Sequence, residues 1–337
     1  MSENKRVYKL DNLRGLAILL VVFGHSIILY SNSWNLIQTS VHVPTLSYIK
    51  DIINLIQMPL FFSLSGYLFA YSKKKTNVPA FILAKLKRLL IPYFFFAFFW
   101  LIPIRLMLNY HNWRSLSPQT IIIKTVLGGE DNGHLWFLQC LFCCFIVAEL
   151  CKVMLQKYIN HNDKKHIIVW MLAGCLALLI PGKLDIFHVK YNFIYFCLGI
   201  VLNSVCSTKP LPKSRTTHQP KRNNIILLIA ITLCGTVISL ITRNSHISSV
   251  TSIFIVVLLY FIMTNKYNRC LAFLGKYSFG IYLFHSPLTY ITYTYIPNAN
   301  PLVVVFINFM LFGSVALMLS IAFSKCFLKI FIGEPLH

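Results

Sequence analysis

Charged residues are scarce in this chain, and acidic residues are the scarcest. Only 12% of the 337 residues are charged, with 9 Asp and Glu against 31 Lys and Arg. A soluble domain has about 25% charged residues, so this composition excludes an ordinary cytosolic enzyme. The 57% of hydrophobic residues excludes a disordered chain. The first apolar run also lacks an A-x-A-like cleavage site, so we expect it to remain in the protein as a helix.

No single basic stripe accompanies the formal net charge of +22. Lys and Arg instead form short clusters between apolar segments, which is typical of membrane topology and not of nucleic-acid binding. The 10 cysteines lie almost wholly within apolar runs or basic loops, so we expect reduced thiols that fill space. The C-x-x-C of Cys140 and Cys143 has apolar neighbours, and we interpret it as part of a packed helix, not as a metal or redox site.

Apolar blocks of about 20 residues, the length that crosses a bilayer, recur along the whole chain. Their continuous apolarity, without alternation, favours helices over the strands of a barrel. We therefore predict an all-α, polytopic membrane helix bundle of about ten transmembrane helices. A single integral membrane domain is expected over residues 1–337, with no appended soluble domain. The predicted helices are 13–31, 52–71, 89–108, 134–155, 167–180, 191–206, 225–242, 247–264, 278–296 and 302–324.

The distribution of positive charge supports this count. When the ten helices alternate in direction, 24 of the 31 Lys and Arg residues fall on one side and 7 on the other. Cytoplasmic loops carry the excess of Lys and Arg, and a wrong count would have scrambled this asymmetry. The sequence therefore predicts that both termini are cytoplasmic.

Two polar residues in the first predicted helix are candidates for function, because polar groups inside a membrane are costly. Arg14 lies near its cytoplasmic start and His25 lies about three turns further along, so both project from the same face. Each has a purely structural alternative. His25 could be a core histidine bonded to a neighbouring helix, and Arg14 an interfacial anchor.

Further polar candidates lie at the ends of other predicted helices. Lys85 and Arg88 are three residues apart at the cytoplasmic start of the third helix and are expected on one face. Cations at a helix start oppose the helix dipole, so they indicate either an anionic ligand or topological charge. On the outer side, Glu130, His134 and Trp136 indicate either an aromatic anchor at the membrane interface or part of a pocket for a polar substrate.

His285 is predicted about two turns into the membrane from the cytosol, in the ninth helix. Most of these candidate residues lie in five segments of the sequence. In the same order along the chain, these segments resemble the motifs of the acyltransferase 3 family of integral membrane O-acyltransferases. These segments are Leu10–His25, Phe62–Tyr67, Lys85–Arg88, His134–Leu138 and Ser278–His285. The family shows an Arg, ten residues and then a His in its first membrane helix, as Arg14 and His25 do here. It usually has Arg-x-x-Arg at the start of the third helix, whereas this chain has Lys85, which loses the bidentate fork of arginine.

The resemblance implies transfer of an acyl group, often acetyl, from cytosolic acyl-CoA to a hydroxyl of a carbohydrate or glycan. His25 is then expected to act as general base. Arg14 is expected on the same catalytic stripe, at its cytoplasmic end, where the donor phosphates arrive. Lys85 and Arg88 are expected to bind the donor phosphates. His134, Trp136, Glu130 and His285 are then candidates for the acceptor pocket.

No metal and no bound cofactor are expected, since acyl-CoA is a co-substrate. The resemblance also implies an integral protein of a bacterial inner membrane. A two-step route through an acylated His25 is the alternative chemistry. A transporter with a proton-coupling histidine within the membrane is the alternative function, although we see no internal repeat of the kind that carriers often have.

Overall fold

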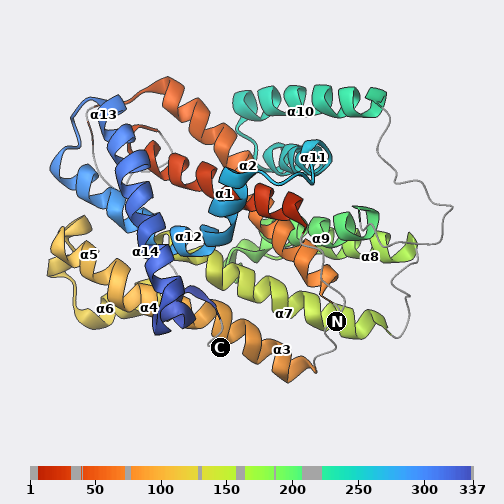
Figure 1. Ribbon diagram of the computed structural model, residues 1–337, viewed down its shortest axis with the longest axis horizontal. Coiled ribbons are helices and arrows are strands. Elements are labelled where there is room, and N and C mark those ends of the chain that lie inside the picture. Colours follow the sequence, from red (N-terminus) through yellow and green to blue (C-terminus); the bar gives the residue numbers. More distant parts are fainter. Residues whose placement is uncertain are drawn as a thin grey trace.

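A computed structural model describes residues 7–31, 39, 41–72, 77–127, 131–156, 164–185, 187–206 and 222–334. Within these residues the chain is helical and contains no strand. Figure 1 shows helices packed side by side, with α1 and α12 in the interior and α10 at the edge. The predicted all-α class is therefore confirmed.

Each predicted apolar block corresponds to a helix or to several helical pieces in series. The α-helices are α1 Tyr8–Ser26, α2 Pro44–Tyr71, α3 Val78–Lys85, α4 Ile91–Phe96, α5 Ile102–Met107, α6 Pro118–Ile122, α7 Trp136–Gln156, α8 Lys164–Ala177, α9 Val189–Cys206, α10 Arg222–Thr242, α11 Ser245–Ile262, α12 Arg269–Tyr295, α13 Pro301–Phe306 and α14 Gly313–Lys325. Turns of π-helix join α3, α4 and α5 into one long helix, and another joins α13 to α14.

Six helical segments of the described chain are long and apolar enough to cross a membrane. They are Pro44–Tyr71, Val78–Met107, Gly133–Leu155, Asn223–Thr242, Ser245–Ile262 and Pro301–Lys325. The helices α8 and α9 are apolar but shorter. The helices α1 and α12 are long as well, with 19 and 27 residues, but they are more polar. They are the helices that carry His25 and His285.

Four predicted helix starts were wrong. The helix α2 begins at Pro44 and not at residue 52, and the long helix of α3 to α5 begins at Val78 and not at residue 89. The other two errors concern polar first turns. The helix α1 begins at Tyr8 and not at residue 13, because Asp11 and Arg14 pair at 3.5 Å across one of its turns. The helix α12 begins at Arg269 and not at residue 278, since the side chain of Asn268 caps it by accepting from the Leu271 N–H at 3.0 Å. His285 consequently lies deeper in its helix than predicted.

Glycines bring α1 and α12 into close contact near their first turns. A Cβ on Gly15 would collide with the backbone carbonyl of Leu271, and a Cβ on Gly275 with that of Asp11. Small residues allow such a close backbone approach. The two helices then run in the same direction from this crossing, because His25, ten residues after Gly15, meets His285, 14 residues after Leu271.

A second pair of glycines brings α2 and α9 together. A Cβ on Gly66 would collide with the carbonyl oxygen of Phe196, and a Cβ on Gly199 with that of Ser63. The helix α2 also packs against α1. As a result, α2 lies between the α1–α12 pair and the helices α9 and α11. One face of α2 packs against α1, and other faces pack against α9 and α11.

Candidate active site

Two histidines from distant parts of the sequence meet where α1 and α12 run side by side. His25 is in the last turn of α1, and His285 is in the middle of α12. His285 Nε2 lies 3.3 Å from His25 Nδ1, and the ring centroids are 4.8 Å apart with an interplanar angle of 84°. His285 is fully buried, whereas His25 is half-buried.

The hydrogen-bond partners assign the proton on each neutral ring. His25 Nδ1 lies 2.9 Å from the carbonyl oxygen of Val21, and His285 Nδ1 lies 2.8 Å from that of Tyr282. A carbonyl oxygen can only accept, so both Nδ1 atoms carry the proton. His285 Nε2 then presents a lone pair to His25 Nδ1–H, and His25 Nε2 keeps its own lone pair. An imidazole held in this way is suited to act as a base at Nε2.

His134 is the third histidine of this cluster, and a proline explains its position. Pro287 lies inside α12 and has no N–H, so the carbonyl of Leu283 one turn earlier loses its helical donor. His134 Nε2 donates to that carbonyl at 3.1 Å, and its ring centroid lies 5.6 Å from that of His285. Its Nδ1 is buried and has no hydrogen-bond partner in the described part of the chain.

Aromatic side chains fix the backbone around the three histidines. The Tyr293 hydroxyl donates to the carbonyl oxygen of His25, and the Tyr282 hydroxyl donates to that of His134. Trp100 Nε1 donates to the carbonyl oxygen of Phe284 at 3.1 Å. These bonds connect α1, the π-helical turn Ala97–Leu101, η6 (Gly133–Leu135) and α12, so the cluster is held from several elements.

A buried cation approaches the cluster from α2. Lys50 is only 3% exposed, and its Nζ lies 3.1 Å from the position that a Cβ on Gly24 would occupy. Gln57 Oε1 lies 3.2 Å from the same point. The glycine before His25 therefore makes room for an ammonium group and an amide from the neighbouring helix. Lys50 is one of the seven Lys and Arg residues predicted on the outer side. The apolar pattern did not single it out, because it precedes the predicted start of its helix at residue 52.

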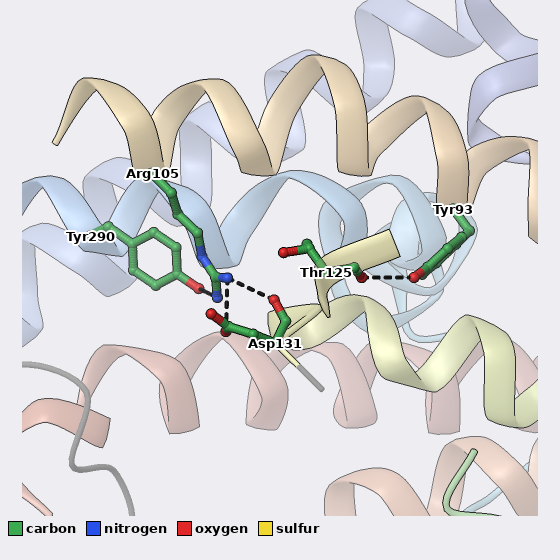
Figure 2. Close-up of polar contacts among 5 residues, drawn as sticks. All are labelled: Tyr93, Arg105, Thr125, Asp131 and Tyr290. Carbon is green, nitrogen blue, oxygen red and sulfur yellow. Dashed lines mark hydrogen bonds and ion pairs between the residues drawn. The ribbon is translucent and has the colours of Figure 1, made fainter. Parts of the chain in front are cut away.

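A buried arginine holds the segment that leads to His134 (Figure 2). Arg105 Nη1 donates to the carbonyl oxygen of Asp131 at 2.8 Å and to its carboxylate at 2.9 Å, and Nη2 donates to the Tyr290 hydroxyl at 3.2 Å. The guanidinium also lies over the rings of Tyr110 and Trp113, at 4.5 and 4.8 Å from their centroids. Burial raises the pKa of the Tyr110 phenol, so this ring stays neutral.

The same segment is fixed at two more points. Gly133 has a φ of +55° and lies against Arg105, a conformation that favours glycine. Tyr93 donates to the carbonyl oxygens of Thr125 and Val126 at 3.1 and 2.9 Å (Figure 2). Sequence analysis missed the role of Arg105, although an arginine inside an apolar helix is the signal that should have indicated it.

The predicted donor-binding cations lie apart from the histidine cluster in the structure. The Arg14 side chain is 28% exposed and pairs with Asp11. Lys85 is half-buried, with Nζ 3.6 Å from the ring centroid of Phe145, whereas Arg88 is exposed. Lys85 ends α3, and Arg88 lies in the π-helical turn Leu86–Leu90 that follows it.

The residues predicted for the acceptor pocket do not all lie together in the structure. His134 and His285 belong to the cluster, whereas Trp136 is half-buried with its ring centroid 5.7 Å from that of His188. Glu130 lies outside the described residues. Asp131, the neighbouring acid, is instead the partner of Arg105.

Comparisons with known proteins agree with the resemblance. The profile of the family described as Acyltransferase domain matches residues 7–325. Nodulation protein NolL of Sinorhizobium fredii (strain NBRC 101917 / NGR234) is 26% identical over 206 residues, which are 59% of this chain and 50% of that protein. The chain thus spans about half the length of this relative. No solved structure matches the chain significantly.

The family match covers nearly the whole chain and includes all three histidines of the cluster. It also covers the six segments long and apolar enough to cross a membrane. By this match, the chain belongs to the acyltransferase 3 family.

Proposed function

We propose that this protein is a membrane-embedded O-acyltransferase that moves an acetyl group from cytosolic acetyl-CoA to a hydroxyl of a carbohydrate or glycan. Family membership supports acyl transfer. The observation that carries the mechanism is the bond from His25 Nδ1 to the Val21 carbonyl, which leaves His25 Nε2 free to act as the base.

In the proposed reaction, the acceptor hydroxyl gives its proton to His25 Nε2 while its oxygen attacks the thioester carbonyl carbon. The C–S bond then breaks, the acetyl group stays on the acceptor oxygen, and the CoA thiolate takes the proton from the imidazolium. His285 Nε2, 3.3 Å from His25 Nδ1, stabilises that imidazolium while it carries the proton. Lys50 supplies positive charge near the developing oxyanion.

The donor and the acceptor approach from opposite sides in this proposal. Arg14, Lys85 and Arg88 bind the phosphates of CoA at the cytoplasmic side; Arg14 and Arg88 are accessible enough to meet a dissolved anion. On the outer side, His134 Nδ1, which has no partner among the described residues, accepts a hydrogen bond from the acceptor. Trp136 and Glu130 complete the acceptor side.

The proposed topology has ten membrane helices with both termini in the cytoplasm of a bacterial cell and the protein in its inner membrane. The 24-to-7 distribution of Lys and Arg supports this orientation. It puts the C-terminal end of α1, where His25 lies, toward the outer side.

Acyl transfer by the purified protein in detergent tests the proposed function. Labelled acetyl-CoA is mixed with the protein and with glycans extracted from cells that lack it. We expect CoA release that depends on the glycan, and label on the glycan. A proton-coupled carrier would release no CoA, and that result would reject the proposal.

A further inference from the structure

A cavity with both polar and apolar lining residues lies between α2, α9, α10 and α11, next to the candidate active site. Its volume is about 370 Å³, within the range of about 300–1,000 Å³ that is typical of small-molecule pockets. The side chains on which the argument depends are Asp51, Asn54, Asn192, Tyr195, Arg243 and Ser252. The cavity lies where α2, α9 and α11 begin and α10 ends, which is also the end of the bundle at which α1 ends.

The cavity wall is rich in hydroxyl and amide groups for a site between membrane helices. Ser239 and Ser248 hydrogen bond to each other at 2.6 Å, and the Tyr195, Ser249 and Ser252 side chains line the same wall. Hydroxyl and amide groups can donate and accept alternately, as the hydroxyls of a sugar require. Such polar groups at fixed positions orient a ligand in a pocket.

The charges in the cavity select among polar ligands. Asp51 supplies a carboxylate and Arg243 a guanidinium to the same lining. The Asp51 carboxylate would repel a purely anionic headgroup, and the Arg243 guanidinium would repel a cation. A neutral, polyhydroxylated ligand can use both groups as hydrogen-bond partners.

A pair of amides connects the cavity to His25. Asn54 lines the cavity and accepts a hydrogen bond of 3.0 Å from Gln57 Nε2. Gln57 Oε1 in turn lies 3.2 Å from the Cβ position of Gly24, the residue before His25. The Asn54–Gln57 pair on α2 thus reaches from the cavity lining to Gly24, where Lys50 and Ile53 of the same helix also make contact.

We propose that this cavity binds a saccharide unit of the glycan acceptor, adjacent to the unit whose hydroxyl reacts at His25. The inference rests on the proposed function, since it assigns a second subsite to the same acceptor. It predicts that longer glycans are better acceptors than short ones, because only they reach both subsites.

Chain-length dependence tests this assignment. Glycans from cells lacking the protein are partly hydrolysed and separated by length, and kcat/KM is measured for the shortest and for longer fragments with labelled acetyl-CoA. In Ser249→Leu, which fills the cavity, we expect the ratio of kcat/KM for long to short fragments to fall about tenfold, as the loss of one or two hydrogen bonds implies. Ser245→Leu is the control, because it is on the same helix, exposed and outside the lining.

A second variant tests the same cavity without adding a bulky side chain that could disturb folding. Arg243 is exposed, so Arg243→Gln does not disturb packing, and the same fall in the ratio is expected. Wild-type ratios in both variants would overturn the cavity assignment while leaving the proposed function intact. If the wild-type protein acetylates no fragment of any length, the proposed function itself fails.

Discussion

His285 Nε2 faces His25 Nδ1 at 3.3 Å, with the two rings nearly perpendicular. Since His285 Nδ1 donates to backbone carbonyls, its Nε2 can only accept in the neutral ring. His285 thus helps to hold the proton of His25 on Nδ1, which leaves the lone pair on His25 Nε2. In catalytic triads a carboxylate orients the base in the corresponding way.

Substitution of His285 tests this positioning role. In His285→Ala we expect kcat for acetyl transfer to fall roughly 10- to 100-fold, the cost of a lost hydrogen bond to a charged group. His285→Gln should recover part of this loss, because its amide oxygen can accept from His25 Nδ1. Equal rates in the two variants would indicate that His285 only fills space.

Substitution of Pro287 tests whether the hydrogen bond from His134 to the Leu283 carbonyl positions His134 for catalysis. Pro287→Ala restores an N–H that can bond to the Leu283 carbonyl, which His134 Nε2 now occupies at 3.1 Å. We expect an unfolding temperature at least as high as that of the wild type but slower acetyl transfer, because His134 loses its acceptor. A variant that is both stable and fully active would show that this bond does not matter for catalysis.

The two side chains of the Arg105–Asp131 ion pair differ in exposure to solvent, and this difference predicts how substitutions of Asp131 affect stability. The Arg105 side chain is fully buried, whereas that of Asp131 is 34% exposed. Asp131→Ala leaves a buried guanidinium without its carboxylate and should cost about 3 kcal/mol of unfolding free energy. Asp131→Asn keeps a hydrogen-bond acceptor and should cost only about 1 kcal/mol. Thermal or denaturant unfolding in detergent measures both, and equal costs would contradict the importance of the charge.

The contact between α1 and α12 can be tested at its glycines. Gly15→Ala puts a Cβ against the backbone of Leu271, so we expect a large loss of folded protein and of activity. Gly182→Ala is the matched control, because no atom lies within 4 Å of its added Cβ. Size-exclusion chromatography and acetyl transfer provide the two measurements. If both variants behave like the wild type, close helix contact does not position the histidines.

The positions of the helices could be predicted from the sequence, because long apolar blocks have few other solutions in a membrane. The polar first turns of α1 and α12 could not, since a hydropathy pattern does not distinguish a capped helix start from a loop. Asn268, which caps α12, shows why such a start is nevertheless stable. This error affected the predicted depth of His285.

The candidate site could be predicted only in part. His25, His134 and His285 were each singled out, but hydropathy does not indicate which helices pack together, so their convergence required the structure. The role of Arg105 was visible as an arginine in an apolar block and was overlooked. Lys50 was hidden, because it precedes the apolar run that defined its helix.

Acetyl transfer by His25→Ala, compared with His42→Ala, tests the central claim most directly. His42 is exposed and distant in sequence from every residue of the cluster, so it controls for the loss of a histidine. With labelled acetyl-CoA and glycan, we expect His42→Ala to match the wild type. We expect His25→Ala to be slower by at least about 100-fold, the usual contribution of a general base, at an unchanged unfolding temperature. A folded His25→Ala protein that transfers acetyl groups at the wild-type rate would contradict the role of His25 as the base.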